Sequence, residues 1–330
     1  MEVDQLKKLD LNYPIRIGLV GSGRVAEFGY LPAFRQTTGV SLVGVADINQ
    51  SRCRDIAPGV PAHESILALI DAGGLDALVI ATPTRFHLAD AQCAAEAALP
   101  ALMEKPPGLD VKEAIALQAL KPSPWIAFNR RFEPGLVRLK DGLPRDGHLH
   151  LRLELHYRRN SWKPFDMQDD ALLDLGPHLI DLARWLTDSE IIWARACSLH
   201  ERRVEFEVGL ERGHATISCS NNSPYRERVE VKNSLGRVSG SYKRGGLLSG
   251  IVARIRPNQE NPLVTSLVGQ LEAFGRAVGG MLGRSPLATA ADGFAVMAAI
   301  DALRRSALHG GASTSVDLIR QAESGRLRRH

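Results

Sequence analysis

Cysteine is scarce in this chain of 330 residues, which has only Cys53, Cys93, Cys197 and Cys219. None of them forms a C-x-x-C pair, and the spacings between them are wide. A disulfide-stapled scaffold or a cysteine zinc site needs closer and more regular spacing. We therefore expect free thiols in a reducing, cytoplasmic setting, and no bound metal.

Long apolar runs and a strong net charge are also missing. No apolar run approaches the about 18 residues that a membrane helix requires. The first 14 residues carry acids without an apolar core, so a signal peptide is not expected. The formal net charge is +4, and no basic stripe with interleaved aromatic residues appears. Neither a membrane nor a nucleic acid is therefore expected as a partner.

The chain does contain the material for two well-cored domains, because 44% of its residues are hydrophobic and its length suits two. In the first domain, residues 1–130, short runs of Val, Ile and Leu alternate with helical segments. Such runs are typical of strands buried on both faces, so we expect an α/β domain with a doubly wound parallel sheet of the Rossmann type. The expected strands are 15–21, 41–47, 77–83, 101–106 and 125–129, and the expected helices are 24–37, 51–57, 63–72, 85–98 and 110–120.

Residues 131–330 follow a different pattern, in which apolar and polar residues alternate strictly. In residues 148–158 the leucines fall on one face, and the other face carries His148, His150 and His156. We expect an α+β domain with a mostly antiparallel, open-faced sheet, with further strands at 203–210, 215–220 and 228–234 and helices near 264–279 and 290–308. The histidine face is interpreted as open to solvent or to a partner subunit, not as a metal site.

The first expected strand runs into a glycine motif in which Gly21, Gly23 and Ala26 occupy the three small positions of a dinucleotide fingerprint. The first glycine permits a tight turn, the second lets the backbone approach a pyrophosphate, and the alanine lets the helix pack close to the strand. Arg24 and Val25, at the start of that helix, complete the predicted phosphate-binding segment. A glycine-rich turn without a ligand is the alternative.

Asp47 ends the second expected strand, where an acid can hydrogen-bond the adenosine ribose of NAD. Its charge would repel a 2′-phosphate, so NAD is expected as the cofactor. Arg52 and Arg54 follow closely, and either could stack on adenine, reach a 2′-phosphate or lie on a solvated helix face. NADP therefore stays open as an alternative cofactor.

Four motifs then occur in order along the chain: "ATPTRFH" (81–87), "MEKPPG" (103–108), "FNRRFEP" (128–134) and "LDLGPHLIDLARWL" (173–186). Together with the last expected helix, this set resembles the Gfo/Idh/MocA oxidoreductase family over almost the whole chain. The resemblance implies transfer of a hydride between a nicotinamide and a secondary alcohol of a sugar, cyclitol or (amino)polyol.

The resemblance also implies roles for single residues. Lys105 of the E-K-P motif would reach the reacting hydroxyl and the nicotinamide, and its peptide bond to the next proline would be cis. His178 would be the general base, and Asp174 would line the substrate pocket. General chemistry agrees, because alcohol oxidation needs a proton acceptor near neutral pH and a cation to stabilise the developing alkoxide. Further cofactor contacts are expected, beside Lys105, at Ala81, Thr82, Pro83, His87 and Glu104.

Each of these catalytic candidates has a structural alternative. Asp174 could cap the helix whose first turn holds Pro177. Lys105 could be a surface lysine beside a proline turn, and His178 could serve structure alone. Asp181, which ends the same motif, is expected to be structural.

One stretch departs from the family pattern, because Gln168, Asp169 and Asp170 stand where many relatives carry glycines. Two carboxylates at this place suggest a substrate with a cationic group, such as an aminocyclitol, unless both acids face solvent. The predicted substrate-binding residues are Asn129, Arg131, Trp162 and Asp170. An interdomain ion pair is the alternative for Arg131, and a loop anchor is the alternative for Trp162.

Two other functions fit the same sequence. One is NAD-dependent glycoside hydrolysis, in which the hydride is borrowed and returned, and the other is a non-catalytic dinucleotide-binding module. In each case the expected partner is a small molecule. A homodimer or homotetramer through the sheet of the second domain is also expected.

Overall fold

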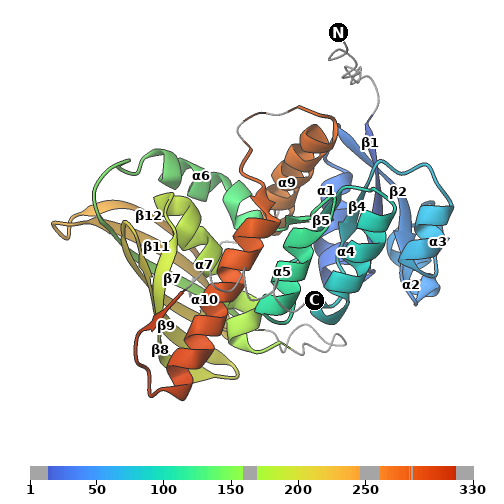
Figure 1. Ribbon diagram of the computed structural model, residues 1–330. Coiled ribbons are helices and arrows are strands. Elements are labelled where there is room, and N and C mark those ends of the chain that lie inside the picture. Colours follow the sequence, from blue (N-terminus) through green and yellow to red (C-terminus); the bar gives the residue numbers. More distant parts are fainter. Residues whose placement is uncertain (1–13, 159–168, 246–260, 282, 284, 317–330) are drawn as a thin grey trace, which may run out of the picture.

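The computed structural model describes residues 14–158, 169–245, 261–281, 283 and 285–316, which form two seven-stranded sheets with helices packed on them (Figure 1). In Figure 1 the first sheet lies on the right and the second on the left, with helices α5, α7, α9 and α10 between and around them. Within the described part of the chain, no helix is both long and apolar enough to cross a membrane.

The first sheet has the strand order β13-β6-β5-β4-β1-β2-β3, and only β13 runs antiparallel to its neighbour. Its central residues, such as Ile17, Leu19 and Val79, are fully buried, as expected for strands covered on both faces. The predicted parallel sheet is confirmed, although β4, β5 and β6 each end three residues before the predicted end. The strands are β1 (Ile15–Val20), β2 (Val40–Ala46), β3 (Ala62–His63), β4 (Ala77–Ile80), β5 (Ala101–Met103), β6 (Trp125–Ile126) and β13 (Ala288–Thr289).

The helices predicted between these strands are present. The first opens with a π-helical turn, η1 (Ala26–Tyr30), and continues as α1 (Leu31–Phe34). The others are α2 (Gln50–Ile56), α3 (Ile66–Asp71), α4 (His87–Glu96) and α5 (Val111–Ala119), with short 3₁₀ turns η2 (Thr84–Phe86) and η3 (Asn129–Phe132). Helix α6 (Pro134–Asp141), which follows η3, was not predicted.

The strand order places the functional residues. After β1 the chain builds β2 on one side of it and β4 on the other. In open parallel sheets, ligands bind outside the carboxyl ends of the strands at such a reversal. The segments that follow β1, β4, β5 and β6 lie along this edge, and they carry Gly21, Thr82, Lys105 and Asn129.

The second sheet has the order β12-β11-β7-β10-β9-β8-β14, and all its pairs are antiparallel except β7 with β10. Leu149, Leu151, Leu153 and Leu155 of β7 are buried, and α7 (Ala171–Thr187) packs on this sheet. The mostly antiparallel sheet is confirmed, but β8, β12 and β14 were not predicted. Its strands are β7 (Leu149–Arg158), β8 (Ile191–His200), β9 (Arg203–Leu210), β10 (Gly213–Ser220), β11 (Asn222–Asn233), β12 (Val238–Gly245) and β14 (Thr314–Ser315).

The last part of the chain returns to the first sheet. Helix α9 (Pro262–Val278) buries Leu267, Leu271 and Phe274 in the same apolar cluster as Ile17 and Leu19 of β1. Helix α10 (Ala290–Leu308) contacts α5 of the first layer and β8 of the second sheet. A domain division at residue 130 stays a proposal, because the two halves share this packing.

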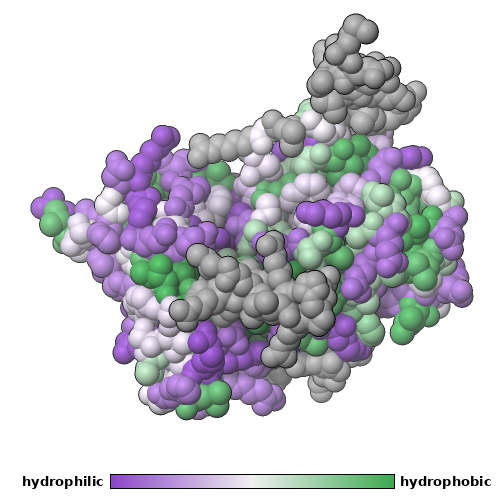
Figure 2. Space-filling model, in the orientation of Figure 1, coloured by the Kyte–Doolittle hydropathy of each residue, from purple (hydrophilic) through white to green (hydrophobic). Residues whose placement is uncertain are grey.

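On the face shown in Figure 2, apolar residues form small separate patches between hydrophilic ones. Scattered patches of this size are ordinary for a protein surface.

Candidate active site

The glycine motif adopts the geometry that a dinucleotide loop needs. Gly21 has φ +101°, and a Cβ there would lie 2.6 Å from the carbonyl oxygen of Ala81, so only glycine fits. A Cβ on Gly23 would meet nothing within 4 Å, which leaves open space beside the backbone. Ala26, in the first turn of the first helix, is fully buried. The loop therefore offers an accessible backbone above a tight turn, as a pyrophosphate site requires.

The side chains of Asp47 and Arg52, which follow β2, both contact Ser22, the residue between the two glycines. The Ser22 N–H donates to Asp47 Oδ2 at 2.7 Å, and the Ser22 carbonyl accepts from Arg52 Nε at 2.6 Å. Arg52 also pairs with Glu27 Oε2 at 2.5 Å. Asp47 thus stands beside the phosphate loop, where an adenosine ribose would lie, and Arg52 packs against the loop instead of extending from its helix. Arg54 is exposed.

The segment after β4 is tied to its neighbours through His87. This histidine is 1% exposed, with Nδ1 2.9 Å from the Pro106 carbonyl and Nε2 2.8 Å from the Thr82 carbonyl. Burial lowers the pKa of His87, although both carbonyls act in the opposite direction. Both ring nitrogens of His87 thus contact carbonyls of the loops after β4 and β5, and its predicted cofactor contact stays a prediction. Thr82 is partly exposed and Pro83 is exposed.

The E-K-P motif lies directly after β5, and the Lys105–Pro106 peptide is cis, as the resemblance implied. Glu104 Oε1 accepts from the Tyr30 hydroxyl at 2.8 Å. Burial raises the pKa of Glu104, and it raises the pKa of Tyr30 as well. Glu104 thus connects the first helix to the loop that carries Lys105.

Lys105 and Asp174 are brought together from positions 69 apart in the chain. Lys105 Nζ donates to the Asp174 backbone carbonyl at 2.8 Å and to Asp174 Oδ1 at 3.2 Å. The Asp174 side chain is 1% exposed and that of Lys105 is 14% exposed. An ammonium and a carboxylate therefore meet at the carboxyl edge of the first sheet, so Lys105 is not an isolated surface lysine.

Helix α7 begins earlier than the sequence suggested. Its N-cap is Asp170, whose Oδ1 accepts from the Leu173 N–H at 2.8 Å, so Asp174 lies inside the first turn and is not the cap. Pro177 lies within the helix instead of in its first turn. His178 follows Asp174 by one turn on the same face and is partly exposed.

The two acids in place of the family's glycines have protein partners. Asp169 Oδ2 accepts from the Thr84 hydroxyl at 3.0 Å, and Asp170 caps α7. Neither acid is simply exposed to solvent, contrary to the alternative kept for them. The partners of Asp170 favour a structural role over the predicted substrate contact. Trp162 and Gln168 lie outside the described residues.

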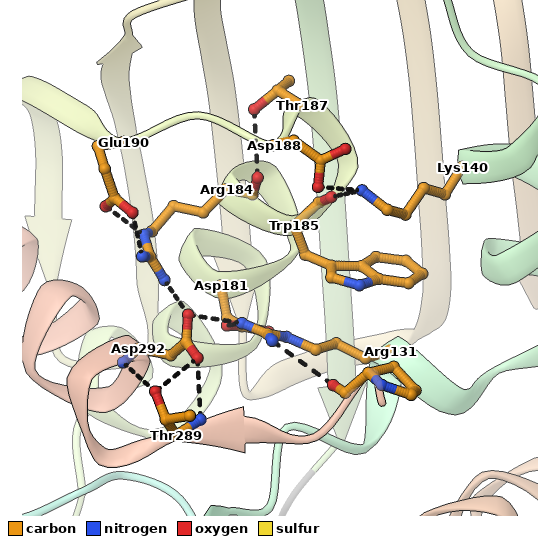
Figure 3. Close-up of polar contacts among 11 residues, drawn as sticks. Arg131, Lys140, Asp181, Arg184, Trp185, Thr187, Asp188, Glu190, Thr289 and Asp292 are labelled. Atoms are coloured by element: carbon orange, nitrogen blue, oxygen red, sulfur yellow. Dashed lines mark hydrogen bonds and ion pairs between the residues drawn. The ribbon is translucent and has the colours of Figure 1, made fainter. Parts of the chain in front are cut away.

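Arg131 forms an ion pair, the alternative weighed for it. Its Nε and NH2 lie 2.9 Å and 2.5 Å from the two oxygens of Asp181, which is fully buried. Figure 3 shows Arg131 and Arg184 converging on Asp292, at 3.2 Å and 3.0 Å. With its donors turned to protein acceptors, Arg131 is better explained as a structural tie than as a substrate contact.

Asn129 is also buried, and its Nδ2 donates to Ser266 at 3.2 Å. Its Oδ1 has no hydrogen-bond partner among the described residues, so its substrate role stays a prediction. Sequence reasoning missed the contacts of Tyr30 and Thr84. Thr84 lies within the quoted "ATPTRFH" motif, so its place was marked but its partner was not.

Known proteins resemble this chain in sequence and in fold. A family model described as an oxidoreductase family with an NAD-binding Rossmann fold matches residues 15–123. The rhizopine catabolism protein MocA of Rhizobium meliloti is 32% identical over 186 residues, which are 53% of this chain and 58% of that protein. YceM of Salmonella typhimurium, which is named as an oxidoreductase, is 31% identical over 235 residues, 69% of this chain and 71% of that protein. The chain thus spans little more than half of the first relative and over two thirds of the second.

A solved structure resembles nearly the whole fold. The scyllo-inositol dehydrogenase of Lactobacillus casei, crystallised with NAD(H) and scyllo-inositol, gives a TM-score of 0.76 over 92% of this chain and 99% of that chain, at 18% identity. At this identity the likeness concerns the fold, and it extends over both sheets.

Proposed function

The chain belongs to the Gfo/Idh/MocA oxidoreductase family, and from this premise we propose that it is an NAD-dependent dehydrogenase acting on a secondary alcohol of a sugar, cyclitol or related polyol. The observation that carries the proposal is the contact of Lys105 Nζ with Asp174, at 2.8 Å and 3.2 Å, on the crevice edge that also bears the glycine loop. The inositol bound by the structural neighbour supports a polyol as the substrate class.

The cofactor site of the proposal follows the edge of the first sheet. The open space at Gly23 and the tight turn at Gly21 fit a pyrophosphate, and Asp47 fits an adenosine ribose. When bound, NAD⁺ would accept the hydride that leaves the carbinol carbon. The residues proposed to border it are Gly21, Gly23, Arg24, Val25, Ala26, Asp47, Ala81, Thr82, Pro83, Glu104 and Lys105.

Asp47 and Arg52 together support NAD over NADP. A 2′-phosphate would meet the Asp47 carboxylate, and the nearby cation that could offset it, Arg52, is paired with Glu27 and Ser22. The cost of placing two anions together without a counter-charge is large in a partly buried site.

The proton chemistry falls to the three crevice residues. A lysine ammonium has three N–H donors, and within the described part of the chain the contacts with Asp174 use two of them, which leaves one for the oxygen of the reacting alcohol. Its charge would stabilise the alkoxide as the hydride leaves. His178, one turn further along α7, would take the hydroxyl proton, and Asp174 fixes the lysine.

A panel of polyols, sugars and aminocyclitols tests the proposal, with NADH formation measured by absorbance and NADP⁺ run in parallel. In His178→Ala the turnover of the best substrate should fall about 10²-fold or more, because the general base is lost. The matched control is His309→Ala, an exposed histidine after α10, which should keep wild-type turnover. Glycoside cleavage without net NADH would instead favour the borrowed-hydride hydrolase, and equal turnover in His178→Ala would remove that residue as the base.

An assembly through the second sheet is part of the proposal. Helices α7 and α10 pack on this sheet, and the polar side of β7 carries the partly exposed His150 and the exposed Arg152. His156 on the same side is buried at 6% exposure, so the expectation of an open histidine face holds only in part. We expect a homodimer or homotetramer, which light scattering during gel filtration would detect. A cytoplasmic location stays a prediction from the sequence.

A further inference from the structure

The segment from Thr82 to His87, together with Ala81 before it, contacts three parts of the candidate active site. On its N-terminal side, Ala81 closes over Gly21 of the phosphate loop. In the middle, the Thr84 hydroxyl donates to Asp169 Oδ2 at 3.0 Å. At its end, His87 Nδ1 lies 2.9 Å from the carbonyl of Pro106. A single short segment of the first sheet thus touches the phosphate loop, the lysine loop and the start of α7.

The contact at Asp169 lies very close to the catalytic turn. Asp170, the next residue, caps α7 by accepting from the Leu173 N–H, and Asp174 follows in the first turn. A helix start that is capped moves with its cap, because the cap fixes the first turn. Asp169 therefore lies directly before the cap of the turn that carries Asp174, so a shift of Asp169 would be passed on to that turn.

These contacts form a closed ring. Lys105 is followed in the chain by Pro106, whose carbonyl contacts His87. His87 belongs to the same short segment as Thr84, which donates to Asp169. Asp169 precedes α7, and Asp174 in the first turn of α7 contacts Lys105. Thr84 is 8% exposed and His87 is 1% exposed, so water competes little at these two side chains, whereas Asp169 is partly exposed.

We propose that Asp169 is a positioning residue, which sets the place of Asp174 and His178 relative to Lys105 through its hydrogen bond with Thr84. The proposal rests on the proposed function and extends it to a residue at which the sequence departs from the pattern of many relatives. It also replaces the interpretation of Asp169 as a site for a cationic substrate. In the ring, Asp169 needs only an acceptor oxygen, whereas a cation site needs its negative charge.

The experiment compares Asp169→Ala, Asp169→Asn and Thr84→Val with the wild-type protein. Positioning predicts that Asp169→Ala and Thr84→Val each lower kcat about tenfold, with KM for NAD⁺ within about twofold, because only the alignment of the reacting groups changes. The double variant should be no worse than either single variant, since both remove the same bond. Asp169→Asn keeps an acceptor oxygen and should retain most of kcat. Thr314→Val, on the far edge of the second sheet, is the control.

Hydrogen exchange of the peptide spanning residues 169–178 gives a readout that does not depend on turnover. Exchange should accelerate in Asp169→Ala and Thr84→Val and stay near wild type in Asp169→Asn and Thr314→Val. Additive losses of kcat, or a loss in Asp169→Asn equal to that in Asp169→Ala, would overturn the positioning role. If the wild-type protein reduces no NAD⁺ while the exchange pattern holds, the proposed function fails and the tie between Thr84 and Asp169 stands.

Discussion

Helix α7 carries two acids, and each contacts a cation from a segment that follows a strand of the first sheet. The two ion pairs serve different purposes. Asp174 pairs with Lys105 after β5, and Asp181, two turns along the same helix face, pairs with Arg131 after β6. Both acids are buried, at 1% and 0% exposure. Position and burial are therefore matched, and the difference lies in the cation and its remaining partners.

The pair of Arg131 and Asp181 is closed, in the sense that the guanidinium donors are directed at protein acceptors. Arg131 contacts both oxygens of Asp181 and reaches Asp292, which Arg184 and Thr289 also contact (Figure 3). Burial, the largest influence, lowers the pKa of Arg131, but the ion pairs with Asp181 and Asp292 outweigh it and raise that pKa. This arginine stays charged and held by protein groups at every pH of interest.

The pair at Lys105 is open by comparison. Among the described residues, Lys105 Nζ donates only to the two oxygen atoms of Asp174, and an ammonium has a third donor. A closed pair fixes the packing of one element on another, whereas an open pair keeps a charged donor in a partly dry site. Unused bonding capacity, rather than burial or charge, thus separates the candidate catalytic pair from the structural one.

The largest effect is expected from breaking the closed pair. Arg131→Met leaves the carboxylate of Asp181 buried without its bidentate partner, and the free energy of unfolding should fall by about 3–5 kcal/mol. Urea denaturation would measure the loss. The double variant Arg131→Met/Asp181→Leu removes both charges and should recover most of the stability, because an apolar pair of similar volume needs no partner. A single variant as stable as the wild-type protein would contradict the structural role.

The open pair should respond in its activity instead. Lys105→Arg keeps a positive charge opposite Asp174, so the free energy of unfolding should change by less than about 1 kcal/mol. The planar guanidinium cannot place a donor where the compact ammonium does, and kcat should fall about 10²-fold. NADH formation and urea denaturation on the same sample would separate the two effects. The mirror variant, Arg131→Lys, loses the bidentate contact and should lose stability while kcat changes by less than about threefold; the reverse pattern would abolish the distinction between the pairs.

Much of the fold could be predicted because its signals are local. Buried runs such as that of β1 encode a parallel sheet, and Gly21 is needed for a backbone angle that other residues rarely adopt. Strand β8 escaped prediction because polar and small residues, such as Arg195 and Ser198, interrupt its alternation. Helix α6 was missed because a helix of only eight residues, the first of them a proline, carries little periodic signal.

The site was predictable only in part, since partners depend on contacts between distant segments. Lys105 and Asp174 lie 69 positions apart and were joined through a family resemblance rather than a local pattern. For Arg131 two roles were open, and the location of Asp181 two turns beyond Asp174 decided between them. Nothing in the sequence near Asp169 indicates that Thr84 would be its partner.

The smallest expected effect is a pH dependence of stability, and it comes from Asp292, which contacts both Arg131 and Arg184. Burial alone would raise its pKa, but the charges of Arg131 and Arg184 and the Thr289 N–H lower it to about 2. An acid with a lowered folded-state pKa stabilises the fold above its ordinary pKa near 4, and this contribution disappears as the pH falls from about 5 to about 2. Asp181 acts with the opposite sign, because burial raises its pKa.

The variant Asp292→Asn isolates the contribution of Asp292. It should be about 2 kcal/mol less stable than the wild-type protein at pH 7, and this difference should disappear toward pH 2. Urea denaturation across this range would show it, and a gap that is constant with pH would mean that Asp292 contributes only hydrogen bonds that an amide cannot replace.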